Sequence, residues 1–262
     1  METASPFRLS AAQLKWIALI SMVIDHVAYF FELPVFLRWI GRLAAPIFLY
    51  FVVEGFCRTH DLKKYLLRMY AVAVLMGVAN YLLANYATGV RQDGLTPDNS
   101  ICSMFFLLLL LLQGIRLLQQ RKILPGILLL LLPFAVSLLL LNLLPLPISY
   151  LLLTTVLPSP FLAEGGIVYL GLGILLYLFR GKKKVQFTAF LLYSLGCNVL
   201  LLLPMVSSPA IFFTDYFQWM EIFALVPLWL YSGERGRSSR WFFYVFYPAH
   251  IYLLWLLSFL VL

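Results

Sequence analysis

The feature that most constrains this chain is a series of long apolar stretches separated by short polar loops. A helix needs about 20 apolar residues to cross a bilayer. Nine stretches come close to or reach that length: 12–31, 39–57, 65–86, 100–118, 124–145, 161–179, 186–205, 216–231 and 241–261. Because a lipid-exposed backbone must satisfy its own hydrogen bonds, these stretches predict helices. We therefore expect an all-α polytopic membrane bundle of about nine spans (eight to ten), forming a single domain over residues 1–262.

The composition excludes the soluble alternatives. Hydrophobic residues make up 63% of the 262 residues, and charged residues only 11%, against about 25% in a typical soluble domain. A soluble enzyme, a nucleic-acid-binding module and a disordered chain are therefore excluded, so no nucleic-acid partner is expected. The remaining apolar segment, 145–160, contains four prolines. It is too short to cross and is expected to be re-entrant or interfacial.

The basic residues predict the orientation of the chain. With nine spans, all of the 19 lysines and arginines except Arg38, Arg42 and Arg91 fall on one side of the membrane. Positive charge marks the cytoplasmic face, so the N-terminus is expected inside and the C-terminus outside. This pattern is typical of a multi-pass protein of a cell membrane, here the inner or plasma membrane, with membrane lipids as partners.

Ionisable residues inside apolar spans are costly and indicate function. In this chain the polar residues within spans are Asp25, His26, Glu54, Asn80, Glu164, Glu221 and His250. Two of the three histidines are among them, and a neutral imidazole is well suited to moving protons near neutral pH. Nothing in the sequence has the spacing of a metal site, and the three cysteines form no CxxC pair.

Asp25 and His26 are neighbours near the outer end of the first span. On a helix they point about 100° apart, so Asp25 cannot easily orient the ring of His26. Asp25 is expected to pair with Arg38 or Arg42, which lie four residues apart on one helix face. Two interpretations of His26 stay open: a core histidine bonded to a backbone carbonyl, or a reactive group.

The last span carries a polar and aromatic stripe at helical spacing, formed by Arg240, Tyr244, Tyr247 and His250 or Ile251. Pro248 is expected to kink the helix beside His250. An interfacial aromatic belt would also explain the tyrosines, although His250 lies deep for a belt residue.

A basic rim follows the second span. Glu54 and Arg58 are four residues apart and are expected to pair, and His60, Lys63 and Arg68 follow. Such a rim suits a phosphate-rich cytosolic cofactor, and anionic lipid headgroups would explain it equally well. The sequence contains no Walker, GxGxxG or HExxH motif, so nucleotide hydrolysis and zinc proteolysis have no support.

Three segments, LKWIALISMVIDHVAYF, RWIGRLAAPIFLYFVVEGFCRTHDLKKYLLRMY and FYVFYPAHIYLL, resemble the TraX family of membrane proteins. The matching blocks lie within 14–70 and 241–254. That family includes the enzyme proposed to acetylate the N-terminus of conjugative pilin, and it is similar to multi-span acyltransferases that use cytosolic acetyl-CoA. The resemblance implies acetyl transfer from acetyl-CoA, without a metal, to an amine or hydroxyl outside.

The resemblance also implies roles for particular residues. The expected catalytic group comprises His26, Asp25, Arg42, Glu54 and His250. The residues expected to bind acyl-CoA or substrate are Arg38, Arg58, His60, Lys63, Arg68, Asn80, Tyr244 and Tyr247. The acceptor is a peptide, a glycan or a lipid-linked polymer, and the leucine-rich spans could support a homodimer.

Two other functions compete with the acetyltransferase hypothesis. In a proton-coupled transporter or flippase of a cell-surface precursor, the intramembrane Asp, Glu and His residues would form a proton relay. The absence of inverted repeats and of paired broken helices disfavours it. In a structural membrane partner of a surface assembly, the same residues would tolerate substitution.

Overall fold

The structure is a computed structural model that describes residues 8–86, 93–97, 100–237, 240–259 and 261. Within those residues every regular element is helical, apart from one isolated β-bridge between Leu9 and Tyr231. The chain divides into two compact units, 1–51 with 179–262, and 52–178. The helices confirm the all-α membrane fold, whereas the expectation of a single domain stays a prediction.

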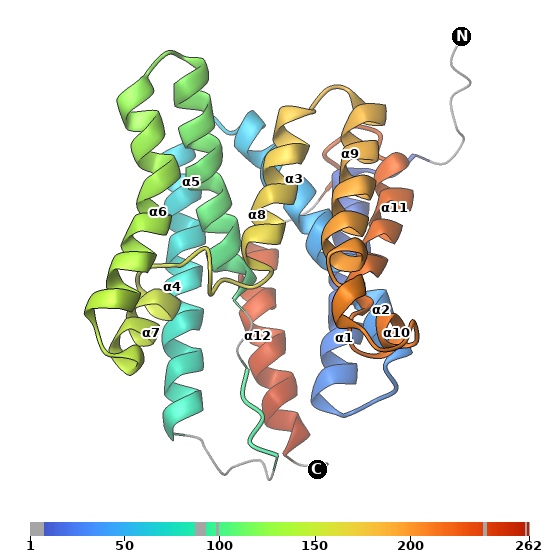
Figure 1. Cartoon of the computed structure of the whole chain (residues 1–262). Helices are drawn as coiled ribbons and strands as arrows, with labels where there is room; N and C mark the ends of the chain where they lie inside the picture. Colours follow the sequence, from blue (N-terminus) through green and yellow to red (C-terminus); the bar gives the residue numbers. More distant parts are fainter. Residues whose placement is uncertain (1–7, 87–92, 98–99, 238–239, 260, 262) are drawn as a thin grey trace. The chain divides into compact units, whose positions relative to one another are not determined.

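Seven helical segments of the described residues are long and apolar enough to span a bilayer (Figure 1). They are Ala11–Phe30, Phe36–Arg58, Leu62–Tyr86, Ile101–Gln119, Ile123–Leu143, Lys183–Met205 and Trp241–Ser258. Each corresponds to an expected span. The two other expected spans, 161–179 and 216–231, contain only shorter helices.

The first unit contains most of the elements near the chain ends. Its α-helices are α1 (Ala11–Phe30), α2 (Phe36–Gly41), α9 (Lys183–Leu195), α10 (Ile211–Thr214), α11 (Leu225–Trp229) and α12 (Arg240–Ser258). Its other helices are the π-helix η1 (Gly196–Leu200) and the 3₁₀ helices η2 (Leu203–Met205) and η3 (Phe217–Ala224). Helix α3 (Ala44–Arg58) begins in this unit and ends in the other.

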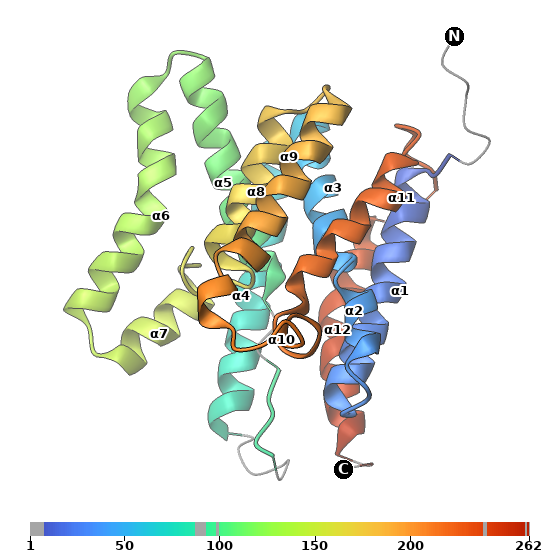
Figure 2. The ribbon, with the colours of Figure 1, turned by 45° about the vertical axis from the view of Figure 1, so that its right-hand side comes forward.

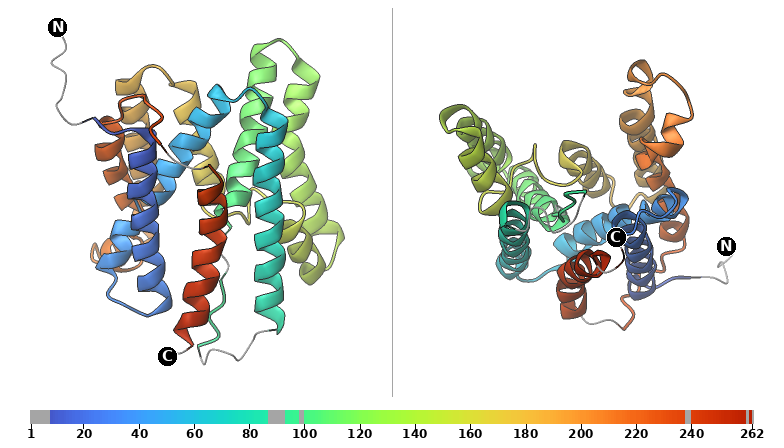
Figure 3. Two further views of the ribbon diagram at one scale, coloured as in Figure 1. Left: turned by 180° about the vertical axis from the view of Figure 1, so that it is seen from behind. Right: turned by 90° about the horizontal axis from the view of Figure 1, so that it is seen from below.

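Helix α1 begins at a capping box. The Ser10 hydroxyl accepts the backbone N–H of Gln13 at 3.3 Å, and the Gln13 side chain accepts the backbone N–H of Ser10 at 2.8 Å. The two bonds satisfy backbone donors that a helix start leaves unpaired. Further along, Met22 of α1 belongs to a buried apolar cluster against which Phe246 and Tyr247 of α12 pack, and Figure 3 shows these two helices as neighbours.

The expected α-helical span over 216–231 is wrong in its helix type. Residues Phe217–Ala224 form the 3₁₀ helix η3, and only the five residues of α11 are α-helical. Even so, the segment runs the length of α1 (Figure 2). Just before the segment begins, the Trp39 indole donates to the Phe213 carbonyl at 2.9 Å, and near its end the Leu230 carbonyl accepts the backbone N–H of Leu9 at 2.8 Å. A 3₁₀ helix rises about 2.0 Å per residue instead of 1.5 Å, so this short stretch covers more distance.

The second unit contains five helices besides the end of α3. They are α4 (Leu62–Tyr86), α5 (Ile101–Gln119), α6 (Ile123–Leu143), α7 (Leu146–Thr155) and α8 (Gly166–Leu178). Helices α5 and α6 pack as a hairpin in which Gly114 and Gly126 let the two backbones approach closely. Most large side chains of α6, such as Leu131 at 60% exposure, face outward, as expected for a lipid-facing helix.

Helix α8 occupies the expected span 161–179 but is only 13 residues long. Gly165 and Gly166 have φ values of 72° and 48°, a left-handed conformation that delays the helix start. The segment nevertheless runs beside α5 from end to end. The Glu164 carboxylate accepts Ser100 N–H at 3.0 Å, and the Tyr177 hydroxyl donates to Gln119 at 3.2 Å.

Helix α7 and the turn after it occupy the segment 145–160, whose re-entrant or interfacial position stays a prediction. The ten-residue helix packs against the middle of α4. The Tyr70 hydroxyl of α4 donates to the Val156 carbonyl at 2.8 Å. A Cβ placed on Gly77 would lie 2.3 Å from the Thr154 carbonyl oxygen, so this contact depends on glycine.

We expect Gly77→Ala to destabilise the protein by about 1–3 kcal/mol, the usual cost of overpacking. Gly196→Ala is the matched control, because a Cβ there meets nothing within 4 Å. Unfolding of both purified variants in one detergent, followed by circular dichroism, measures the difference. Equal stability of the two variants would show that α7 does not pack on α4 in this way.

Candidate active site

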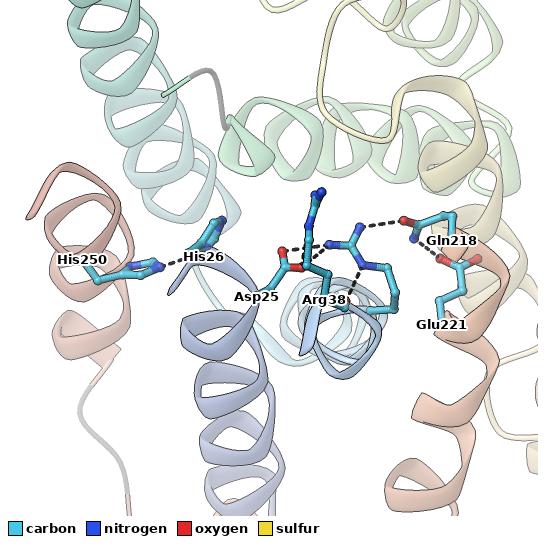
Figure 4. Close-up of polar contacts among 7 residues, drawn as sticks. Asp25, His26, Arg38, Gln218, Glu221 and His250 are labelled. Atoms are coloured by element: carbon cyan, nitrogen blue, oxygen red, sulfur yellow. Dashed lines mark hydrogen bonds and ion pairs between the residues drawn. The ribbon is translucent and has the colours of Figure 1, made fainter. Parts of the chain in front are cut away.

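Two intramembrane histidines meet in the first unit. His26 of α1 and His250 of α12 are each 6% exposed, and Nδ1 of His26 lies 3.0 Å from Nε2 of His250 (Figure 4). The two residues are 224 positions apart in the chain. Packing of α1 against α12 therefore creates a hydrogen-bonded imidazole pair that is nearly closed to solvent.

A backbone carbonyl determines which nitrogen of each ring holds a proton. Nδ1 of His250 lies 2.9 Å from the carbonyl oxygen of Phe246. A carbonyl can only accept, so Nδ1 of His250 donates and, in a neutral ring, its Nε2 accepts. Nδ1 of His26 must then be the donor of the bond between the rings. Two neutral rings also avoid a buried charge, and Nε2 of His26 is left with a free lone pair.

Aromatic rings hold the pair in place. The Phe246 ring stacks on His250 with centroids 5.1 Å apart and planes 10° apart, and Tyr247 lies 5.9 Å from the same imidazole. Phe30 stacks on His26 at 6.3 Å. Of the predicted tyrosines, Tyr247 is thus beside His250, whereas Tyr244 packs against Trp241 at 6.3 Å. Helix α12 continues through Pro248 without a break.

The expected ion pair of Asp25 is confirmed. Nη2 of Arg42 lies 2.7 and 2.8 Å from the two Asp25 carboxylate oxygens, and Nε of Arg38 lies 3.7 Å from Oδ1. Gly41 allows this approach, because a Cβ there would lie 2.2 Å from Cβ of Asp25. Asp25 therefore faces α2 while the adjacent His26 faces α12.

A polar chain extends from Arg42 to a buried carboxylate (Figure 4). Nη1 of Arg42 donates to Oε1 of Gln218 at 2.9 Å, and Nε2 of Gln218 donates to Oε2 of Glu221 at 2.9 Å. Glu221 is fully buried. Its other oxygen accepts the Ser194 hydroxyl at 2.6 Å and the Asn198 amide at 3.0 Å. The carboxylate is thus surrounded by donors, as a buried charge requires.

The sequence pattern assigns no role to Gln218, Ser194 or Asn198, and Glu221 stands out in it only as an intramembrane carboxylate. Their spacing is the sequence pattern that could have indicated this cluster: Gln218 and Glu221 are three residues apart, and Ser194 and Asn198 are four apart. Their convergence requires the 3₁₀ helix η3 and the π-helix η1. A π-helix is rare and often occurs at functional sites.

The predicted rim residues lie in the second unit. The Glu54–Arg58 pair is confirmed at 2.7 Å, with Glu54 buried and Arg58 exposed. His60 and Lys63 are exposed, and Arg68 is half-buried on α4 together with Asn80. Asp61 precedes α4, and the Lys64 backbone N–H that it accepts at 3.0 Å lowers the pKa of its carboxyl.

The structure thus divides the predicted site residues into two groups. Asp25, His26, Arg38, Arg42, Tyr244, Tyr247 and His250 belong to the first unit, whereas Glu54, Arg58, His60, Lys63, Arg68 and Asn80 belong to the second. In the described part of the chain, no three His, Cys, Asp or Glu residues are grouped as they would be around a metal ion.

The arrangement predicts one tautomer for both intramembrane histidines. In ¹⁵N-histidine NMR spectra of the protein in nanodiscs, we expect both rings to be protonated at Nδ1 and bare at Nε2. The chain has three histidines, so His60→Asn, His26→Gln and His250→Gln assign the signals. A His26 ring protonated only at Nε2 would contradict the hydrogen-bond order.

Glu221 offers a test of the polar chain. We expect Glu221→Leu to destabilise the protein by about 3 kcal/mol or more, because removal of one partner leaves buried polar groups unpaired. Glu221→Gln retains one acceptor oxygen, so we expect it to lower the free energy of unfolding by less than Glu221→Leu does. Glu234→Gln, at an exposed position, is the control in denaturant unfolding. If Glu221→Leu and the control unfold at the same denaturant concentration, the hydrogen bonds to Glu221 do not stabilise the protein.

Comparison with known proteins shows which family this chain belongs to. The family model described as "TraX protein" matches residues 10–258. The "Probable fimbrial assembly protein FimC, serogroup H1" of Dichelobacter nodosus is 29% identical over 256 residues, which cover 94% of each chain. No solved structure matches the chain. The family match includes every helix of the described residues and both intramembrane histidines, and the chain belongs to the TraX family.

Proposed function

We propose that the protein is a membrane acetyltransferase that moves the acetyl group of cytosolic acetyl-CoA to an amine or hydroxyl of an acceptor outside. The observation that carries the proposal is the buried His26–His250 pair, which leaves Nε2 of His26 with a free lone pair. A neutral imidazole in that state can act as a general base. The resemblance of the TraX family to acetyl-CoA-dependent enzymes supports the same reaction.

In the proposed reaction, Nε2 of His26 takes the proton of the acceptor amine as the amine nitrogen attacks the thioester carbonyl carbon. The C–S bond breaks, and the proton passes from His26 to the departing CoA sulfur. His26 returns to its neutral state, so atoms and charge balance. Nε2 of His250 accepts from Nδ1 of His26 at 3.0 Å, and this bond stabilises the transient imidazolium.

The basic rim supplies the proposed donor site. Arg58, His60 and Lys63 are exposed around the end of α3 and the start of α4. On the orientation that the basic residues predict, they lie on the cytosolic side, where the CoA phosphates would bind them. Arg68 adds a guanidinium whose Nε has no hydrogen-bond partner in the described part of the chain.

The proposed acceptor is a protein subunit of a surface fimbria, modified at an amine. The relative from Dichelobacter nodosus is described as a probable fimbrial assembly protein and matches this chain over almost its whole length. A fimbrial subunit on its way to the surface would present its amine on the outer side, near the end of α1 that holds His26.

The proposal predicts that the purified wild-type protein binds radiolabelled acetyl-CoA saturably and releases free CoA when an amine acceptor is added. His26→Gln should still bind acetyl-CoA, but its rate of CoA release should fall by about 10²- to 10⁴-fold, the usual contribution of a general base. Leu131→Ala on the exposed face of α6 is the control. Equal CoA release by wild type and His26→Gln would contradict the role of His26.

A further inference from the structure

We propose that Arg38 binds an oxyanion group, a carboxylate or a phosphate, of the acceptor. This inference rests on the proposed function for the identity of the acceptor. It starts from a difference between the two arginines next to Asp25. Arg42 is occupied by protein partners, whereas the side chain of Arg38 is held in place and, within the described residues, donates no hydrogen bond.

Arg42 uses its donors within the protein. Nη2 bonds both oxygens of Asp25, Nη1 bonds Gln218 and Nε bonds the Arg38 carbonyl at 3.3 Å. Glu221 fixes the orientation of the Gln218 amide, because a carboxylate accepts only from the amide nitrogen. The oxygen of Gln218 is thereby turned to Arg42, so this guanidinium is not available to a substrate.

Arg38 makes no such bonds. Within the described residues the Arg38 side chain donates no hydrogen bond: its Nε is buried without a hydrogen-bond partner, and its only ionic contact is from Nε to Asp25 Oδ1 at 3.7 Å. Its guanidinium lies 4.9 Å from the ring of Tyr29 and 5.4 Å from that of Phe217. Two aromatic rings therefore hold the planar group in position. The side chain is 32% exposed.

This arrangement suits an oxyanion. A guanidinium presents parallel N–H donors that match a carboxylate or phosphate, and holding it in place beforehand reduces the entropy lost on binding. Among the described ion pairs, two arginines share the single carboxylate of Asp25, so this group of three side chains carries one net positive charge. The only other carboxylate of the polar chain, Glu221, is separated from Arg42 by the Gln218 amide.

The position of Arg38 indicates that the anion belongs to the acceptor. Arg38 follows the loop 31–35, which lies on the outer side in the predicted orientation. The CoA phosphates would enter from the cytosolic side, by the rim. An anion at Arg38 therefore comes from the outside, and His26 is the neighbour of the aspartate that Arg38 contacts.

Matched acceptors test the inference. Tetrapeptide amides with a free N-terminal amine would carry glutamate at the second, third or fourth position, each paired with its glutamine counterpart. The full-length protein would be assayed in phosphatidylcholine nanodiscs. We expect at least one glutamate peptide to have a KM about ten- to a hundredfold below that of the matched glutamine peptide, which is the usual effect of a hydrogen bond to a charged group. Wild type without any preference for glutamate would overturn the inference.

Variants of Arg38 assign the preference. Arg38→Gln should remove it by raising KM for the glutamate peptide while changing kcat little. Arg38→Lys should retain part of it, because the charge remains and the planar fork is lost. Arg237→Gln, at an exposed position, should behave as wild type. An undiminished preference in Arg38→Gln would overturn the inference.

A binding measurement separates this inference from the proposed function, because it needs no acetyl transfer. We expect inorganic phosphate to show ³¹P line broadening with wild type in phosphatidylcholine nanodiscs, and not with folded Arg38→Gln. The same signal must persist in nanodiscs that contain phosphatidylglycerol. Its loss there would show that a lipid headgroup occupies Arg38 and would overturn the assignment to the acceptor. Broadening that is equal in Arg38→Gln would also overturn it.

Discussion

The bidentate contact between Asp25 and Arg42 is the constraint on which the rest of the site depends. An aspartate within a span is costly unless it is paired, and here it is paired at 2.7 Å across the close approach that Gly41 allows. This contact fixes the face that α1 turns to α2. Because adjacent helical residues diverge by about 100°, it also fixes the direction of His26, which meets His250 of α12.

Local spacing predicted much of this site. Asp25 and the two arginines, Arg38 and Arg42, carry opposite charges in neighbouring spans, and a charge in lipid needs a partner, so the pairing of Asp25 with one of the two arginines follows from the sequence. Glu54 and Arg58 pair for the same reason, at helical spacing. Seven of the nine expected spans followed from the length of the apolar stretches, because the bilayer sets a minimum length for a helix.

Tertiary and backbone features could not be predicted in the same way. The contact between His26 and His250 depends on how α1 packs on α12, which no local pattern encodes. Glu221 meets Ser194 and Asn198 through a 3₁₀ helix and a π-helix, and an apolar stretch does not reveal these departures from the α-helix. The left-handed glycines at 165 and 166 likewise shortened an expected span.

The proposed catalytic unit is a pair of histidines, and a double-mutant cycle tests it most directly. CoA release would be measured for wild type, His26→Gln, His250→Gln and the double variant under one set of conditions. If His250 acts through the ring of His26, replacing His250 should cost activity in wild type and little or nothing once His26 is gone. If the second replacement reduces release by the same factor in both backgrounds, the two histidines act independently and the account is wrong.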